Sequence, residues 1–170
     1  TADDVVTGAR IDTVQVFNSG DSIVLGDGND SLSATLNAGT VTPVAMTGVE
    51  NVMFTVLGDA TVDFDNVSGV TSIISRGSSA TLLVDDIQEI PATISINNNT
   101  AVQTFVVKDT AVSGNTDSIT LNFDGVGGVV NVGGETDGDG DIEAFTIVAS
   151  AGASDLGVGN GFGADATTIT

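Results

Sequence analysis

Short apolar runs recur along almost the whole chain, and each is closed by glycine, asparagine, aspartate or serine. Within a run the apolar residues alternate with polar ones, which is the pattern of a β-strand with one buried face. Successive runs begin so close together that no room is left for long helices. The strands that we predict are residues 49–56, 60–67, 70–74, 80–84, 92–96, 103–107, 117–123, 129–132 and 142–149.

Short strands at regular spacing are typical of sandwiches, barrels and β-solenoids. We expect an all-β fold, a right-handed parallel β-solenoid with irregular rungs, and the alternative is a β-sandwich of Ig-like or cadherin-like type. The chain has no Trp, no Tyr and only seven Phe, so Val, Ile, Leu and Ala must fill the core. With 22 glycines and two prolines, its turns are expected to use Gly, Asn and Asp.

The chain also contains an internal similarity. Residues 48–73 and 140–169 share a glycine, an apolar residue and a glutamate (Glu50, Glu143), then a strand with a central Phe, and each segment closes at TSI or TTI. In so Gly- and Thr-rich a sequence, chance is the rival explanation. We predict one β-rich domain over residues 1–170, made of two degenerate repeats at about 21–110 and 117–170.

The charge is strongly acidic, with 23 Asp and Glu against three Lys and Arg and a formal net charge of −20. Nucleic acid is excluded as a partner because a phosphate backbone requires Lys and Arg. No apolar run has membrane length, so we expect no membrane insertion. Such a charge opposes a compact fold unless salt or bound cations screen it. Nineteen of the acids are Asp, which suits turns and calcium loops.

The sequence lacks the residues that several kinds of catalysis require. The chain has no Cys and no His, which removes thiol and imidazole chemistry and the usual zinc sites. No Gly-rich loop is followed by Lys to hold a phosphate, and no Trp or Tyr is present to stack on sugars. We therefore predict that the protein is not an enzyme. The chain starts at Thr1 without a signal peptide, so we expect a mature protein or an excised fragment.

The stretch LGDGNDSLSA, residues 25–34, resembles the calcium-binding nonapeptide GGxGxDxUx of RTX proteins. The resemblance implies that Asp30 is a carboxylate ligand and that Leu32 anchors the following strand. Leu25 stands where the first glycine of the motif is expected, and no second nonapeptide follows, so it supports a single partial site. A tight turn without metal is the alternative. The calcium ligands that we predict here are Asp27, Asn29 and Asp30.

The wider segment from Asp21 to Ser72, with the elements TGVENV and ATVDFDNVSGVTS, is similar to the body of large secreted RTX-type surface-layer proteins and adhesins of Gram-negative bacteria. This resemblance implies an extracellular, calcium-stabilised, β-rich array that packs into a lattice or forms a stalk. It also implies export by a type I system, with the export signal elsewhere in a longer chain.

A second acidic stretch, GETDGDGDIEAF, spans residues 134–145. Oxygen ligands at every second position resemble the first half of an EF-hand loop. The remainder of that motif fails, because Ile142 replaces the turn glycine and Val148 the bidentate glutamate. A solvated Asp-Gly hairpin loop is the alternative. The calcium ligands that we predict here are Asp137, Asp139, Asp141 and Glu143.

Other acids have simpler interpretations. Asp63 and Asp65 alternate with apolar residues, so we expect them on the solvent face of a strand. Asp85, Asp86 and Glu89 precede Pro91, which favours a solvated loop or one short helical turn.

Taken together, these features predict a structural extracellular protein of the bacterial cell surface. It would be a building block of a surface layer, a filament or an adhesin stalk, which self-associates into a lattice or filament and is stabilised or cross-linked by Ca²⁺. The alternative is an adhesin-type binding module that recognises a host or glycan ligand, and a cell-surface polysaccharide is a candidate partner.

Overall fold

The computed structural model describes the chain except for residues 1, 10–12, 115, 136–141, 151–167 and 170. The described residues form strands and turns, with no helix, and hence none that could cross a membrane. The strands are β1 (Val5–Gly8), β2 (Ser22–Val24), β3 (Ser31–Leu36), β4 (Gly39–Val41), β5 (Ala45–Thr47), β6 (Asn51–Val56), β7 (Ala60–Asp63), β8 (Ser72–Arg76), β9 (Leu82–Ile87), β10 (Thr93–Asn97), β11 (Gln103–Val107), β12 (Ser118–Asp124), β13 (Val130–Gly134), β14 (Ala144–Ser150) and β15 (Thr168–Ile169).

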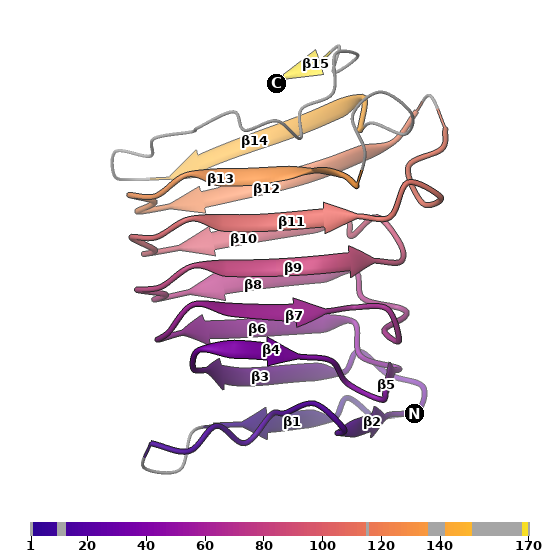
Figure 1. The fold of residues 1–170 in the computed structure, drawn as a ribbon. Coiled ribbons are helices and arrows are strands. Elements are labelled where there is room, and N and C mark those ends of the chain that lie inside the picture. The colour runs from indigo at the N-terminus through magenta and orange to yellow at the C-terminus, as the bar shows by residue number, and fades with distance from the viewer. Residues whose placement is uncertain (1, 10–12, 115, 136–141, 151–167, 170) are drawn as a thin grey trace.

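The strands form three parallel sheets. Eight strands follow the order β1-β3-β6-β8-β10-β12-β14-β15, five follow β13-β11-β9-β7-β4, and β2 pairs with β5. Between neighbours of the large sheet the chain crosses to another sheet and returns, so it coils as a parallel β-solenoid of about six turns. In Figure 1 the rear strands run to the left and the front strands to the right as the chain climbs, which makes the coil right-handed. The solenoid prediction is confirmed, and the sandwich, which needs antiparallel sheets, is wrong.

The register gives the length of each rung. Ser31 pairs with Asn51, Asn51 with Ser72 and Ser72 with Thr93, so three successive rungs are almost equal in length. The next rung is clearly longer, because Thr93 pairs with Thr120. The predicted irregularity of the rungs is therefore confirmed. The structural repeat is the single rung, and the division into two longer sequence repeats stays a prediction.

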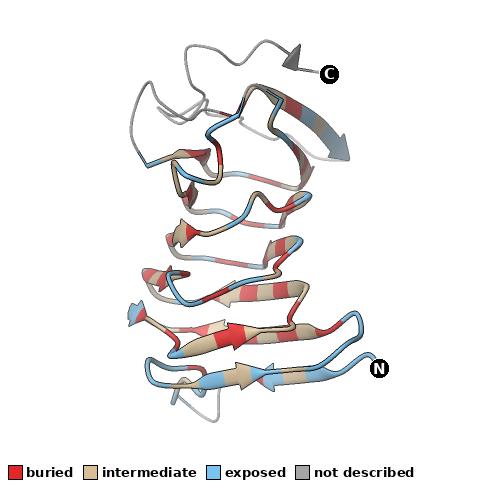
Figure 2. Cartoon of the chain, turned by 90° about the vertical axis from the view of Figure 1, so that its right-hand side faces the viewer, coloured by how far each residue is buried: buried red, intermediate tan, exposed pale blue. Residues whose placement is uncertain are grey.

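The core lies between the sheets. Along β6 the side chains alternate, with Val52, Phe54 and Val56 buried and the residues between them half-buried. Figure 2 shows buried and half-buried residues alternating along several further strands, and the same pattern is found in β3 and β10. Because the pairing is in register, like side chains stack from rung to rung, and one buried column is Leu32, Val52, Ile73, Ile94 and Leu121.

One polar cluster interrupts this apolar interior. Ser75, Ser78, Asn99 and Gln103 are all buried. The Ser75 hydroxyl donates to Gln103 Oε1 at 2.7 Å and accepts from Asn99 Nδ2 at 2.8 Å. Ser78 Oγ accepts from the backbone N–H of Val56 at 3.0 Å. Since buried polar groups are costly only when unpaired, this bonded cluster ties consecutive rungs together without opening the core.

Candidate metal centre

Acidic side chains gather where the strands of the five-stranded sheet end. Parallel strands place their carboxyl ends at one edge of a sheet, and the sequence puts acids at or just after the ends of β7, β9, β11 and β13. We call this group the acidic edge; it consists of Asp63, Asp65, Asp85, Asp86, Asp109 and Glu135, with Lys108 among them.

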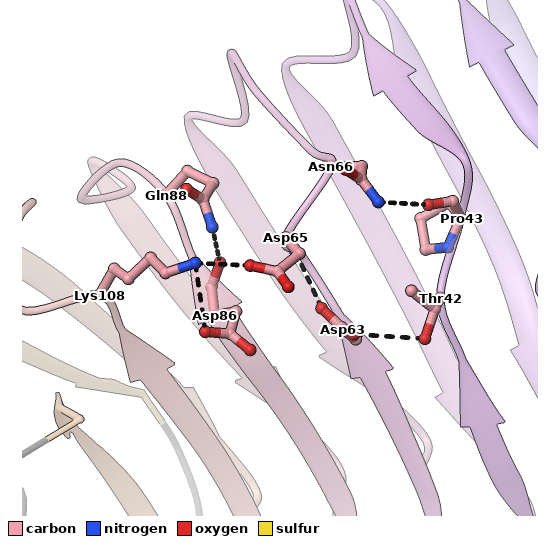
Figure 3. Close-up of polar contacts among 8 residues, drawn as sticks. All are labelled: Thr42, Pro43, Asp63, Asp65, Asn66, Asp86, Gln88 and Lys108. Carbon is pink, nitrogen blue, oxygen red and sulfur yellow. Dashed lines mark hydrogen bonds and ion pairs between the residues drawn. The ribbon is translucent and has the colours of Figure 1, made fainter.

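Three of these carboxylates converge. Asp63, Asp65 and Asp86 each offer one oxygen, and these oxygens lie within 4.8 Å of one another. Asp63 ends β7, Asp65 follows that strand and Asp86 lies in β9, so the group joins two neighbouring rungs (Figure 3). It is the one group of three or more potential metal-ligating acids within the described residues.

A β-bulge gives Asp86 its position. Val84 pairs with Phe105 and Ile87 with Val107, so Asp85 and Asp86 together stand opposite a single residue of β11. Asp86 has a positive φ of 56°, which Asp tolerates better than most residues. The bulge keeps Val84 and Ile87 buried while both acids stay outside the core. The prediction of a loop or helical turn for Asp85 and Asp86 was therefore wrong, because these residues belong to β9.

Local hydrogen bonds fix the other two acids. Thr42 Oγ1 donates to Asp63 Oδ2 at 3.3 Å, and the backbone N–H of Asp65 donates to Asp63 Oδ1 at 2.9 Å. The second hydrogen bond closes a tight local turn at the end of β7, where the chain folds back. Both acids lie outside the core, as predicted, but they converge with Asp86 instead of pointing separately into solvent.

Lys108 supplies a positive charge to the group. Its ammonium forms ion pairs with Asp65 and, at 3.5 Å, with Asp86 Oδ1. The hydrogen bond to Asp65 is the main reason why the pKa of Lys108 is raised. Three carboxylates against one ammonium still leave a net negative charge at this point of the edge.

The neighbouring acids respond to this charge. Partial burial, followed by the charge of Asp86, raises the pKa of Asp85, and Asp63 and Asp65 act in the same direction. A hydrogen bond with Asp86, followed by burial, raises the pKa of Glu135. Both groups therefore hold a proton more readily than free carboxylates. A bound cation would reduce the repulsion between these two acids and Asp86.

The donor set selects the kind of metal that fits. Carboxylate oxygens without imidazole or thiolate are ligands for hard cations such as Ca²⁺ and Mg²⁺. The converging acids supply three oxygens, and a calcium ion takes six to eight, so water or backbone carbonyls would complete the shell. An ion bound to these three carboxylates would compete with Lys108, whose ammonium pairs with Asp65 and Asp86.

The predicted calcium loop before β3 has a different arrangement. Asp27 is exposed, and Asn29 Oδ1 accepts from Asn51 Nδ2 at 2.9 Å. Asp30 is fully buried; its Oδ1 accepts from the N–H of Asp4 at 2.6 Å, whereas Oδ2 has no partner among the described residues. Leu32 is buried, as expected for an anchor. Calcium at Asp27, Asn29 and Asp30 stays a prediction.

The second predicted loop is only partly described. Asp137, Asp139 and Asp141 lie outside the described residues. Glu143 directly precedes β14, and its Oε2 accepts from the backbone N–H of Asp117 at 2.8 Å. In the described part of the chain this side chain therefore has a structural role, as a link between two rungs.

Comparison of the chain with protein families, with curated proteins and with solved structures gave no significant match. The fold and the acidic edge are therefore what the molecule itself offers for an inference about function.

Proposed function

We propose that this protein is a structural building block of an assembly on the bacterial cell surface, and that calcium holds its rungs together. The observation that carries the proposal is the convergence of Asp63, Asp65 and Asp86 from two neighbouring rungs. A divalent cation at this point would join the rungs of β7 and β9 and lower the repulsion along the acidic edge.

Calcium binding would make the stability of the fold higher outside the cell than inside it. An ion that binds the folded chain and not the unfolded one stabilises the fold by mass action. Calcium is abundant outside cells and scarce inside, so a chain of net charge −20 would become rigid after export. The resemblance of residues 21–72 to RTX-type surface proteins supports the same location.

A solenoid also suits a structural role because its rungs repeat along one axis. Its outer faces and end edges can pack against further copies, giving a layer, a filament or a stalk. The alternative function, an adhesin-type module for a host or glycan ligand, predicts saturable binding of a soluble polysaccharide and no ordered self-association.

Thermal unfolding in chelator, in calcium and in magnesium tests the calcium proposal. With calcium at one hundred times its Kd, the wild-type fold should gain roughly 2.7 kcal/mol. Asp86→Asn keeps the shape of the side chain but removes its charge, so we expect it to lose most of this gain. Asp124→Asn removes an exposed charge at the end of β12, outside the acidic edge, and should keep the gain.

Each result has a clear meaning. No midpoint shift in wild type would overturn the calcium proposal. An equal shift in wild type and Asp86→Asn would mean that calcium binds in the loops predicted from sequence and not at the acidic edge.

Electron microscopy of the purified chain with and without calcium tests the structural role, which ordered assemblies would support and dispersed particles would contradict.

A further inference from the structure

The outward side of the large sheet differs in charge from the rest of the molecule. Along β6, β8, β10 and β12, the residues that alternate with the buried ones are uncharged, except for Arg76 and Asp124. We call the outward side of these four strands the neutral face, because its two charges cancel. Since the whole chain has a net charge of −20, a second copy meets less repulsion at the neutral face than at the acidic edge.

The two charges of the neutral face are not used within the described part of the chain. Both residues are exposed and each ends its strand. The Arg76 guanidinium and the Asp124 carboxylate have no hydrogen-bond or ion-pair partner among the described residues. In a chain with 23 acidic residues, a guanidinium without a carboxylate partner is available to a carboxylate of another molecule.

Arg76 and Asp124 lie symmetrically about β10. In the register of the sheet, Asn97 pairs with Arg76 on one side and with Asp124 on the other. The strands β8, β10 and β12 are neighbours in the rear sheet of Figure 1, so each charge is one strand spacing, about 4.8 Å, from Asn97. A two-fold axis that runs along β10 in the plane of a face-to-face contact would place Arg76 of each copy opposite Asp124 of the other.

The apolar side chains of this side of the sheet follow the same symmetry. Ser95 of β10 pairs with Ile74 on one side and with Asn122 on the other. The next strand beyond Ile74 carries Met53, and the next strand beyond Asn122 carries Val148, which is 51% exposed. Met53 and Val148 are therefore each two strands from Ser95. The axis along β10 that pairs the charges also places Met53 of each copy opposite Val148 of the other.

We infer that the neutral face binds the neutral face of a second copy of this chain about a two-fold axis along β10, with two ion pairs between Arg76 and Asp124 across the contact. The inference rests on the proposed structural function and gives the assembly a lateral interface. A two-fold contact requires a self-complementary patch, which the register of β8, β10 and β12 provides. The serine, threonine and asparagine side chains between the charges are short and can hydrogen-bond to one another across the contact.

The overlap of the two faces determines the strength of the contact. About this axis β8 lies opposite β12 and β6 lies opposite β14, so five strands of each copy overlap. Five strands at about 4.8 Å spacing, each with five residues at about 3.3 Å, give a contact of about 24 by 17 Å. A contact of this size belongs to the weak end of specific interfaces. The dimer should therefore form at high protein concentration and be reinforced where many copies are held together.

Charge-swap variants test the pairing. Sedimentation equilibrium of the whole 170-residue chain with calcium, up to millimolar concentration, should show a dimer as the first step of association. Arg76→Glu and Asp124→Arg each place like charges opposite one another twice in the dimer, so each should weaken dimerisation about tenfold or more. The double variant restores both ion pairs in reversed order and should dimerise like wild type. Asp124→Arg also makes the chain less acidic, so an effect of net charge alone would strengthen its association.

A cysteine placed on the axis gives a second measurement. The chain has no Cys, so Ser95→Cys supplies a single thiol, and a short bis-maleimide should join two copies. Thr104→Cys is the matched control, because Ser95 and Thr104 are both half-buried hydroxyls that accept a hydrogen bond at 3.2 Å from an asparagine of the next rung. Thr104 lies in β11 of the five-stranded sheet, so its variant should stay largely uncross-linked.

The outcomes separate this interface from the structural function. Equal dimerisation of wild type and both single variants would overturn the interface, as would a failure of the double variant to recover or equal cross-linking of the two cysteine variants. Ordered assemblies in electron microscopy would then leave the structural function standing, whereas a wild type that stays monomeric and dispersed with calcium overturns both proposals. Asp124 lies outside the acidic edge, so Asp124→Asn remains the calcium control in dilute, monomeric protein.

Discussion

Asp30 shows how one carboxylate can be interpreted as a ligand or as a structural group. The sequence motif predicts a calcium ligand, whereas the structure buries the side chain completely and uses Oδ1 to bind the N–H of Asp4. The second oxygen has no partner among the described residues. A buried acceptor of this kind is costly to leave unpaired, so the two roles predict different effects of substitution.

We expect Asp30→Ala to destabilise the fold by about 1–3 kcal/mol in chelator, because the N–H of Asp4 loses its acceptor. Asp30→Asn keeps that acceptor and removes a buried charge, so it should cost less. Chemical denaturation in chelator measures both values. Equal losses would show that the charge, and not the hydrogen bond, is what the fold needs.

Lys108 provides a second prediction at the residue scale. Its ammonium pairs with Asp65 and Asp86, where a divalent ion would bind. Lys108→Met keeps much of the apolar stem and removes the competing charge. We expect tighter calcium binding by calorimetry and a lower thermal midpoint in chelator. Unchanged or weaker calcium binding would contradict a shared position for the lysine and the metal.

At the scale of elements, local alternation was enough to find the strands from β6 to β14, whereas β1 to β5 and β15 were not among the predicted runs. Each predicted run overlaps a strand of the structure, and QTFVV matches β11 at both ends. The side-chain alternation that identifies a strand is a property of neighbouring residues, and it survives in any β-fold. The regular spacing of these runs fits a sandwich, a barrel or a solenoid, and the parallel pairing of the strands in the structure shows that it is a solenoid.

The acidic edge could not be found in the same way. Asp63 pairs with Asp85 of the next rung, and Asp86 meets Lys108 of the rung after that. This proximity depends on the length of each rung and on a bulge that shifts the register of β9. An acid that recurs at strand ends with the period of one rung would have indicated it, but that period is visible only when the register is known.

The buried polar cluster gives a prediction about how elements are joined. Gln103 lies in a column between Leu82 and Val130, and its Oε1 accepts from Ser75. Gln103→Leu should destabilise the fold by about 1–3 kcal/mol, because the Ser75 hydroxyl loses its acceptor. Ser75→Ala combined with Gln103→Leu should cost less than the sum of the single changes. Additive losses in urea unfolding would contradict a coupled network.

At the scale of the whole molecule, the stacking of rungs concentrates negative charge. Rung after rung places an acid at the same edge, and a net charge of −20 has few internal partners. Burial of the hydrophobic columns stabilises the stacked rungs, whereas repulsion among the carboxylates of the acidic edge destabilises them. Stability should therefore depend on whatever neutralises the edge, which is either a cation or a proton.

Protonation of the acidic edge should change the stability of the fold in a direction that can be predicted. Burial and the charge of Asp86 raise the pKa of Asp85, and a hydrogen bond with Asp86 raises the pKa of Glu135. Between the ordinary pKa of each group and its raised value, the folded chain binds more protons than the unfolded chain. Stability therefore falls as pH rises through this window. In chelator, lowering the pH toward the ordinary pKa values of these groups, 3.8 for Asp85 and 4.5 for Glu135, should therefore raise their contribution to the thermal midpoint, opposite in sign to ordinary acid denaturation.

Two comparisons assign this pH effect to the acidic edge. Excess calcium should flatten the pH dependence, because the ion neutralises the edge before protons do. Asp85→Asn should also reduce the slope, since it removes one of the groups that takes up the proton, whereas Asp124→Asn, outside the edge, should not. A midpoint that falls on mild acidification in chelator would mean that repulsion at this edge does not limit the stability of the solenoid.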